Sequence, residues 1–451
     1  DLHSFPTRRS SDLWQTGTAA ILNTVNLHKD AQITVYERND NISFLSCGIA
    51  IYVEGIVKDI GGFFYCSPEK LAELGVSTKM QHDVTDVDFA AKKVRVKDMK
   101  TGETFEDSYD KLIITTGSWP IQPKIENAGL KNILLCKNYA HAKEIVARTP
   151  QARKVAVIGA GYIGTELVEA FEVQGKEVIV IDQEDQIMPK YLDKEFVEIP
   201  AKEFEKRGVR FALGESVKSF KGDAGGAVSA VVTDKGEYEA DLVILCIGFR
   251  PNTGIFAGKL DMLPNGAIKV DEYMHTSQPD VFAAGDSCTV WSNAKNCYDY
   301  VPLATNAVRM GTLVARNLKR DTTKYMGTQS TSGIKIYDYC IASTGLSEES
   351  AKRAGFNVES STLVENNRPE FMPTYEEVRL KLVYERASRK ILGAQIISKA
   401  DVTPAINTIS VCIQKEMTVE ELAFVDFFFQ PHFNKPWNFL NSVALQALPP
   451  V

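Results

Sequence analysis

One cysteine of this chain has the surroundings of a reactive thiolate. Cys47 lies in Ser46-Cys47-Gly48, at the start of an apolar stretch with helical spacing. The unpaired N–H groups of a helix N-terminus favour the thiolate, so we expect the pKa of Cys47 to be lowered. A lone thiolate that meets an oxidant stops at sulfenic acid, a reversible two-electron store. The sequence therefore predicts a single-cysteine redox centre that acts on a peroxide or a small disulfide. A buried apolar cysteine is the alternative, and it is the expected state of the other cysteines.

A glycine-rich turn further along the chain has the pattern of a dinucleotide site. The spacing G-x-G-x-x-G separates an apolar strand, Val155–Ile158, from a helix, and its glycines are Gly159, Gly161 and Gly164. The first glycine makes the turn, the second lets the backbone approach a pyrophosphate, and the third lets helix and strand pack closely. The next strand ends at Asp182, which would accept from a ribose 2′-hydroxyl. No Arg follows it to bind a 2′-phosphate, so NADH is favoured over NADPH. A merely structural glycine turn is the alternative.

The back half of a similar unit opens the chain. Ala31–Asp40 contains an alternating strand that ends at Glu37, and the interval from Gly17 to Glu37 resembles that from Gly164 to Asp182. The front half, with its strand and first two glycines, would fall on residues 1–13. That segment has no strand or helix period and resembles the in-frame translation of a sequencing-library adapter, so we expect it to have displaced native residues. The alternatives are an ordinary surface strand ending in Glu and an unstructured natural tail.

Other segments have the composition of strand ends beside a ligand. Tyr109–Pro120 closes on Thr-Thr-Gly, Asp280–Cys288 on Ala-Gly-Asp, and Leu242–Asn252 ends the second nucleotide unit. The C-terminal region adds strands at Val378–Tyr384 and Ile391–Ser398 and a helix at Val402–Gln414. Its aromatic run, Phe424–Leu440, predicts a subunit interface, or alternatively a tail packed over its own core.

The composition is that of an ordinary globular protein. The 451 residues are 44% hydrophobic and 24% charged, which excludes disordered, collagen-like and disulfide-scaffold proteins and is enough chain for several domains. The net charge of −7 disfavours a nucleic acid or an anionic membrane as partner. No apolar run reaches the ~18 residues of a membrane span, and no signal-peptide pattern is present. The 8 cysteines contain no CxxC, so a metal cluster is not expected and a reducing cytoplasm is.

Together these motifs resemble a known family. The strings NISFLSCGIAIYVEG, VIGAGYIGTELVEAF, CIGFRPNT, FAAGDS, VPLATNAVRMG and FFFQPHFNKPWN are similar to the single-cysteine branch of the pyridine nucleotide–disulfide oxidoreductases. The resemblance implies an α/β fold with two Rossmann-like domains, for FAD and NAD, and a C-terminal α+β dimerisation domain. The implied boundaries are 1–118 with 247–325 for FAD, 119–246 for NAD and 326–451 for dimerisation. Two-cysteine relatives place their second cysteine at the position of Tyr52, and relatives carry a His at the position of Gln15.

The resemblance also implies the cofactors, FAD and NADH, and the residues that bind them. Tyr162 would gate the flavin face that receives the nicotinamide, and the helix that begins near Pro302 would direct its N-terminus at the flavin. Phe429 of the partner subunit would complete the pocket, and Lys137 is either a ligand or an ordinary solvated lysine. The implied FAD contacts are Gly17, Glu37, Cys47, Thr116, Gly117, Ser118, Lys137, Asp286, Leu303, Ala304 and Thr305. The remaining cofactor-binding positions are Gly159, Gly161, Tyr162, Ile163, Gly164, Asp182 and Gly248.

The activity implied in this way is that of a cytoplasmic, homodimeric NADH oxidase that reduces O2 to water, with Cys47 cycling between thiolate and sulfenic acid. NADH peroxidase, with hydrogen peroxide as acceptor, and coenzyme A disulfide reductase use the same residues and stay open. A non-catalytic NADH-binding protein is the alternative if no FAD binds.

Overall fold

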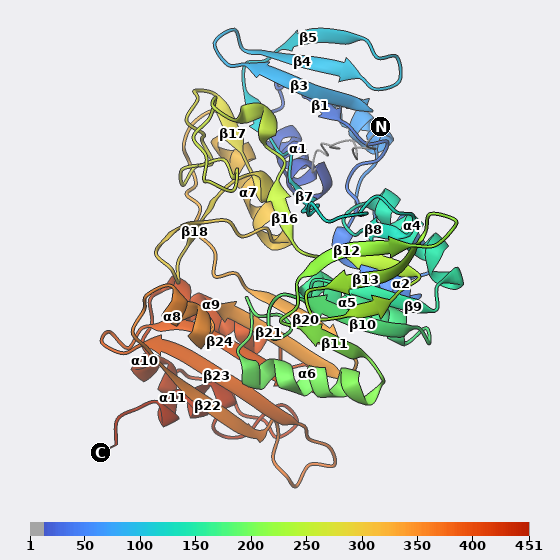
Figure 1. Ribbon diagram of the computed structural model, residues 1–451. Coiled ribbons are helices and arrows are strands. Elements are labelled where there is room, and N and C mark those ends of the chain that lie inside the picture. The colour runs from blue at the N-terminus through green and yellow to red at the C-terminus, as the bar shows by residue number, and fades with distance from the viewer. Residues whose placement is uncertain (1–12, 451) are drawn as a thin grey trace.

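The computed structural model describes residues 13–450, which form three blocks along the chain (Figure 1). The N-terminal block is split in sequence, because its residues precede and follow those of a central sheet, and a C-terminal block comes last. The segment that we expect to have displaced native residues is 1–13, and all of it except Leu13 lies outside the described residues. The mixed α/β class predicted from the sequence is confirmed.

The central block is a five-stranded parallel sheet in the order β11-β10-β9-β15-β8. Its strands read as continuous apolar runs because both faces are covered, and Val155, Ala156 and Val157 of β9 are fully buried. Helices pack on one face, and an antiparallel sheet of β12, β13 and β14 packs on the other. The parallel strands are β8 (Ile133–Leu135), β9 (Lys154–Ile158), β10 (Glu177–Asp182), β11 (Arg210–Leu213) and β15 (Leu242–Leu245), and the flanking ones are β12 (Val217–Gly222), β13 (Val228–Thr233) and β14 (Glu237–Glu239). The helices are α4 (Tyr139–Arg148), α5 (Tyr162–Glu172) and α6 (Lys194–Lys206).

The N-terminal block contains two separate parallel strand pairs. β1 (Thr34–Glu37) pairs with β2 (Ser77–Met80), and β6 (Leu112–Ile114) pairs with β17 (Val281–Ala283). In the central sheet β9 lies between β10 and β15, but among residues 13–450 no strand lies between β1 and β6. A hollow of about 1110 Å³ lies there instead, lined by Val35 of β1 and Ile114 of β6 among others. The sequence analysis expected the back half of this unit, and its helix and second strand are present within residues 13–450.

Helices and small strands complete the N-terminal block. α1 (Thr18–Leu27) packs on α7 (Ala304–Asn317). The helical turn that leads into α1 lies so close to α7 that a Cβ on Gly311 would overlap the carbonyl oxygen of Thr16. The other elements are η1 (Leu13–Gly17), η2 (Ser46–Gly48), α2 (Ile49–Glu54), η3 (Ile60–Phe63), α3 (Pro68–Glu73), β3 (His82–Asp88), β4 (Lys93–Asp98), β5 (Thr104–Ser108), β7 (Ser118–Pro120), β16 (Phe249–Pro251), η5 (Gly254–Phe256), η6 (Gly285–Ser287), β18 (Val290–Ser292) and β19 (Cys297–Asp299), with η4 (Thr149–Gln151) in the central block.

The C-terminal block is a five-stranded antiparallel sheet in the order β20-β21-β24-β23-β22 with helices on one side. The predicted strands and helix are found in this block with small shifts of their ends. The strands are β20 (Ser332–Ile336), β21 (Tyr339–Gly345), β22 (Val358–Asn366), β23 (Glu377–Glu385) and β24 (Ile391–Ser398), and the helices are α8 (Glu348–Arg353), α9 (Ala405–Gln414), α10 (Val419–Ala423) and α11 (Phe439–Gln446).

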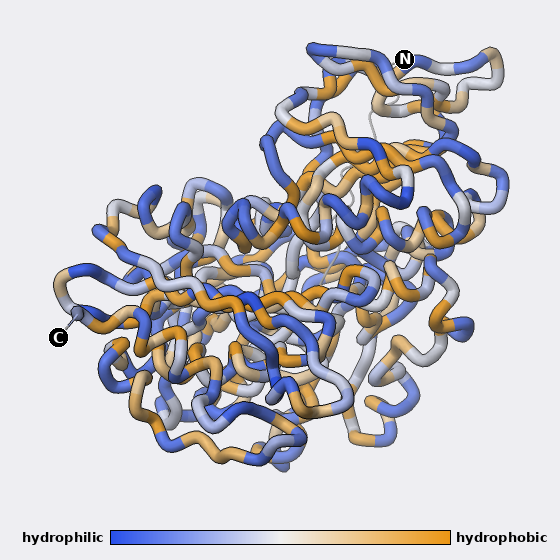
Figure 2. The backbone as a smooth tube through the Cα atoms, turned by 90° about the horizontal axis from the view of Figure 1, so that it is seen from below, coloured by the Kyte–Doolittle hydropathy of each residue, from blue (hydrophilic) through white to orange (hydrophobic). Residues whose placement is uncertain are grey.

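Hydropathy follows this arrangement. Figure 2 shows many of the apolar segments running through the interior and many of the polar segments in the outer loops. Within residues 13–450, every helix is too short or too polar to cross a membrane.

Candidate active site

The glycine turn between β9 and α5 has the geometry of a dinucleotide-binding loop. Gly159 has φ +103°, and a Cβ there would overlap the carbonyl oxygen of Cys246. A Cβ on Gly164 would overlap the carbonyl oxygen of Gly159, so helix and strand touch through this residue. Beside Gly161, by contrast, a Cβ would meet nothing within 4 Å. Protein atoms therefore fill the space beside Gly159 and Gly164, whereas the space beside Gly161 is open to an approaching pyrophosphate.

Asp182 holds this turn in place from the end of β10. Its Oδ2 accepts from the backbone N–H of Ala160 at 2.6 Å, and its Oδ1 accepts from that of Glu184 at 3.0 Å. The carbonyl of Ala160 accepts in turn from the N–H of Met188 at 2.7 Å. Asp182 is partly exposed beside the open turn, which is where a ribose hydroxyl would reach it.

Tyr162 begins α5 and faces the C-terminal block. Its ring stacks on Tyr191, with centroids 4.1 Å apart and an interplanar angle of 14°. Its hydroxyl lies 3.0 Å from the Oγ of Ser332 on β20. The neighbouring Ile163 is half-buried against the core, and Gly248, at φ +103°, accepts from the N–H of Ile121 at 2.9 Å where the central block rejoins the N-terminal block.

Three of the predicted FAD-contacting residues form one buried polar group. The Oγ of Ser118 donates to Asp286 Oδ2 at 2.8 Å, and Lys137 Nζ lies 3.1 Å from that Oγ and 3.3 Å from the same Oδ2. Lys137 is only 7% exposed and its ammonium lies 4.6 Å from the centroid of the Phe249 ring. The alternative of a solvated surface lysine is therefore wrong.

The residues around this group fit a flavin. The Oγ1 of Thr116 is buried without a hydrogen-bond partner, and Gly117 next to it has φ +61°. A buried hydroxyl is costly unless a partner satisfies it, so its environment suits a bound polar group. α7 begins at Ala304 with Leu303 as N-cap and no side-chain cap, so the N–H groups of Ala304 and Thr305 can meet a ligand acceptor.

Cys47 lies in η2, directly before α2, and it is exposed to solvent on one side. The prediction that its pKa is lowered is wrong. Burial raises the pKa of the thiol, the Glu166 carboxylate raises it further, and the Lys137 ammonium opposes both. The physical reason is that α2 is short, with 6 residues, and that the N–H of Gly48 already bonds to Leu45, whereas surrounding protein desolvates the thiolate.

This pKa direction predicts the pH dependence of alkylation in the protein without bound cofactor. A raised pKa means less thiolate at neutral pH, so iodoacetamide should modify Cys47 slowly at pH 7 and faster as the pH rises. The midpoint should lie above the ~8.5 of an ordinary cysteine. Mass spectrometry of the Cys47 peptide across pH 6–10 measures it, with free cysteine in the same solution as reference. A midpoint for Cys47 below that of free cysteine would contradict a raised pKa.

Glu166 is a site residue that the sequence interpretation missed. Burial, aided by the charge of Glu169, raises the pKa of Glu166 to about 7, so this carboxyl is poised to exchange a proton near neutral pH. It lies on α5, which packs against α2, the helix that follows Cys47. Its position one helical turn after Tyr162 places both on one face of α5. The four-residue spacing of Tyr162 and Glu166 was the sequence signal that could have identified Glu166 as a site residue.

Two further predicted FAD contacts, Glu37 and Gly17, belong to the strand pair and helix that open the N-terminal block. Glu37 ends β1 and is fully buried, and its Oε1 accepts from the backbone and side-chain nitrogens of Asn39, each at 2.7 Å. Gly17 has helical angles, φ −63° and ψ −46°, and lines the hollow between β1 and β6. A turn before it is not seen, because η1 continues directly into α1.

Phe429 lies apart from these residues, in the aromatic run after α10. Its side chain is 47% exposed in the single chain, and other large aromatic side chains of the run are exposed too. They are Phe424, Phe428, Phe433 and Trp437. Across the described residues 13–450, no cluster of three or more His, Cys, Asp and Glu side chains could hold a metal ion.

The site combines a parallel sheet that carries a dinucleotide-binding turn with a second block whose buried polar group fits a flavin. An exposed cysteine, Cys47, precedes the helix of that second block that packs on α5. These features define a class of protein, the two-nucleotide oxidoreductases. Residues 15–311 match the family model described as pyridine nucleotide-disulphide oxidoreductase, and residues 331–438 match the model of its dimerisation domain. The chain belongs to the pyridine nucleotide-disulphide oxidoreductase family.

Curated relatives and solved structures agree with this assignment. The chain is 53% identical over 432 residues to the NADH oxidase of Enterococcus faecalis, covering 96% of this chain and 97% of that protein. It is 40% identical over 446 residues to the NADH oxidase of Streptococcus pyogenes, covering 96% and 97%. Among solved structures, the water-forming NADH oxidase of Lactobacillus brevis bound to NADH has 50% identity and a TM-score of 0.95, with 96% of both chains covered.

Proposed function

We infer that this chain is an FAD-dependent NADH oxidase that reduces O2 to water, with Cys47 as its redox-active thiol. The observation that carries the inference is the position of Cys47, which is exposed and directly precedes α2, the helix that packs on α5. α2 belongs to the N-terminal block and α5 follows the glycine turn of the central block. The thiol therefore lies where both cofactors would meet, and the names of the full-length relatives support the same activity.

Each block would have its own task. Residues 1–118 and 247–325 would hold FAD, residues 119–246 would hold NADH, and residues 326–451 would hold the subunits together. Thr116, Gly117 and Ser118 would contact the flavin, and the N-terminus of α7 would stabilise negative charge on it. FAD, when bound, accepts electrons from NADH and passes them to dioxygen.

The protein's own residues then complete the reduction. Dioxygen that has taken up two electrons and two protons is hydrogen peroxide. The Cys47 thiolate attacks one peroxide oxygen, the O–O bond breaks, and the hydroxide that leaves is protonated to water. Two electrons from a second NADH reduce the resulting sulfenic acid back to thiolate and release a second water. The balance is two NADH, one O2 and two protons to two NAD⁺ and two waters.

An oxygen electrode tests this proposal. Purified protein supplied with FAD should consume one O2 for every two NADH and leave no peroxide. If NADH is oxidised only after peroxide is added, the chain is a peroxidase. A colourless, folded protein that binds NADH and oxidises none would overturn the enzymatic assignment.

The exposed aromatic run supports a homodimer. Aromatic side chains that are half or more exposed in one chain, such as those of Phe428 and Trp437, are expected to be covered by a second subunit. In such a dimer Phe429 of the partner subunit completes the flavin pocket. Light scattering of the purified protein, giving twice or once the chain mass, decides between dimer and monomer.

Replacing Asp182 by alanine should weaken discrimination between coenzymes. The substitution removes the acceptor for the ribose 2′-hydroxyl and the bond that holds Ala160. A hydrogen bond to a charged group contributes about 1.5–3 kcal/mol, so the NADH-to-NADPH ratio of kcat/KM should fall about 10- to 100-fold. Glu184→Ala, which alters the adjacent exposed side chain, is the control and should leave the ratio within about twofold. An unchanged ratio in Asp182→Ala would show that the ribose is recognised elsewhere.

A further inference from the structure

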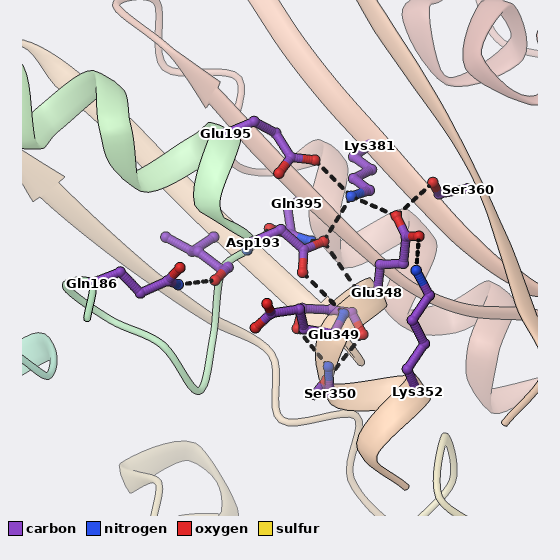
Figure 3. Close-up of polar contacts among 12 residues, drawn as sticks. Gln186, Asp193, Glu195, Glu348, Glu349, Ser350, Lys352, Ser360, Lys381 and Gln395 are labelled. Carbon is purple, nitrogen blue, oxygen red and sulfur yellow. Dashed lines mark hydrogen bonds and ion pairs between the residues drawn. The ribbon is translucent and has the colours of Figure 1, made fainter. Parts of the chain in front are cut away.

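A buried cluster of charges joins the central block to the C-terminal block (Figure 3). Lys381 of β23 is 5% exposed in its side chain, and its Nζ lies 2.9 Å from Asp193 Oδ2, 2.6 Å from Glu195 Oε1 and 2.8 Å from Glu348 Oε2. Asp193 and Glu195 belong to the central block, whereas Glu348 begins α8 of the C-terminal block. One ammonium group thus forms ion pairs with carboxylates from both blocks.

Asp193 is held more tightly than an ion pair alone would hold it. Its backbone N–H donates to Gln395 Oε1 at 2.6 Å, and Gln395 Nε2 donates to its Oδ2 at 2.7 Å. The backbone N–H groups of Glu348 and Glu349, at the start of α8, donate to its two carboxylate oxygens at 3.0 and 3.1 Å. Gln395 lies directly opposite Lys381 in the pairing of β23 with β24. The C-terminal block therefore surrounds the Asp193 carboxylate with hydrogen-bond donors from Lys381, Gln395 and the start of α8.

Asp193 ends the loop 183–193, whose other end lies at the nucleotide turn. This loop begins after Asp182, and the N–H of Met188 within it donates to the carbonyl of Ala160 at 2.7 Å. Ala160 lies between the first two glycines of the turn. The loop also carries Tyr191, whose ring stacks on Tyr162 at 4.1 Å. A shift of the loop would consequently move both the turn and the aromatic pair.

We propose that Lys381 is a positioning residue for NADH binding: through Asp193 it fixes the loop 183–193 and with it the Ala160 turn and the Tyr162–Tyr191 stack. The inference rests on the proposed function, because it assigns the anchored loop to the NADH site. Without the ammonium group, three carboxylates would face one another at the block interface and repel. Asp193 is the group that repulsion would displace, and the loop would leave the nucleotide site with it.

The experiment compares three variants of the full chain. Lys381→Met removes the cation and keeps the apolar stem, and Asp193→Asn keeps the shape of the anchor and removes its charge. Glu195→Gln is the matched control, because Glu195 contacts Lys381 from α6 without holding the loop. The KM for NADH should rise at least about tenfold in the first two variants and less than about twofold in the control, with kcat changed less than about threefold in each. Lys381→Arg should restore most of the affinity.

A second readout needs no catalysis. The exposed Lys190 lies within the loop, so trypsin can cut between it and Tyr191 once the loop is released. Mass spectrometry should detect the new Tyr191 N-terminus at least fivefold faster in Lys381→Met and Asp193→Asn than in the parent or the control. Unchanged cleavage at this bond, or an unchanged KM beside a lowered melting temperature, would overturn the proposal. Faster cleavage in a protein that oxidises no NADH would retain the anchor and refute the proposed function instead.

Discussion

Replacing Cys47 by serine should turn the water-forming reaction into one that releases hydrogen peroxide. The hydroxyl of serine cannot form a sulfenic acid, so peroxide made at the flavin has no thiolate to reduce it. Oxygen consumption should therefore double, from one O2 per two NADH to one O2 per NADH, and peroxide should accumulate in proportion. Electron transfer from NADH should persist, because the residues that hold the nucleotide turn are untouched. An oxygen electrode coupled to a peroxide assay measures both quantities.

The matched control is Cys297→Ser. Cys297 lies on β19 and is exposed like Cys47, although the sequence analysis expected it to be buried. This variant should keep the parent stoichiometry. Undiminished water formation in Cys47→Ser, or peroxide release from Cys297→Ser alone, would remove Cys47 from the mechanism.

Supplying a strand to the hollow between β1 and β6 should tighten FAD binding strongly. Aligning Gly17 with Gly164 places residues 7–14 where Lys154–Gly161 lies in the central block. A variant in which that octapeptide replaces residues 7–14 would put a parallel strand between β1 and β6 and a glycine turn before α1, as β9 and its turn do between β10 and β15. Two added hydrogen bonds to the pyrophosphate, at about 1.5–3 kcal/mol each, correspond to roughly 100-fold or more in Kd. Titration with FAD, followed by flavin fluorescence, measures the change.

The control for this variant separates the strand from the turn. The same graft with its last glycine left as tryptophan restores the strand but blocks the close approach of the backbone to a phosphate. Both grafts should raise the melting temperature, because both fill the hollow, whereas only the glycine form should tighten FAD binding. Equal FAD affinity in parent and graft, with no gain in stability, would show that the hollow does not accept a strand.

The central nucleotide unit could be predicted from the sequence almost completely. Its signal is local: an apolar strand, three glycines, a helix and an acid lie within one short stretch, and each residue's role follows from its neighbours along the chain. The positions of Gly159, Gly164 and Asp182 agree with that interpretation because packing at the turn involves residues close in sequence or in adjacent strands.

The features that were mistaken or missed depend on residues distant in sequence. The pKa of Cys47 is set by burial and by Glu166 rather than by its own helix. Lys137 is buried because it meets Asp286, which lies far along the chain and reaches it only through the split of the N-terminal block. Lys381 is part of no sequence motif, because its carboxylate partners come from two different blocks. Contacts between residues so far apart in the chain leave no periodicity or local spacing in the sequence.

The split of the N-terminal block also sets the order in which the molecule can assemble during synthesis. β6 pairs with β17, and all of the central sheet lies between them in the chain. The central sheet is complete once β15 has emerged from the ribosome, whereas β6 must wait for a strand made after it. At about 5–20 residues per second that delay lasts seconds to tens of seconds, during which the edge of β6 is uncovered. The growing chain would therefore complete its central sheet first and its N-terminal block afterwards.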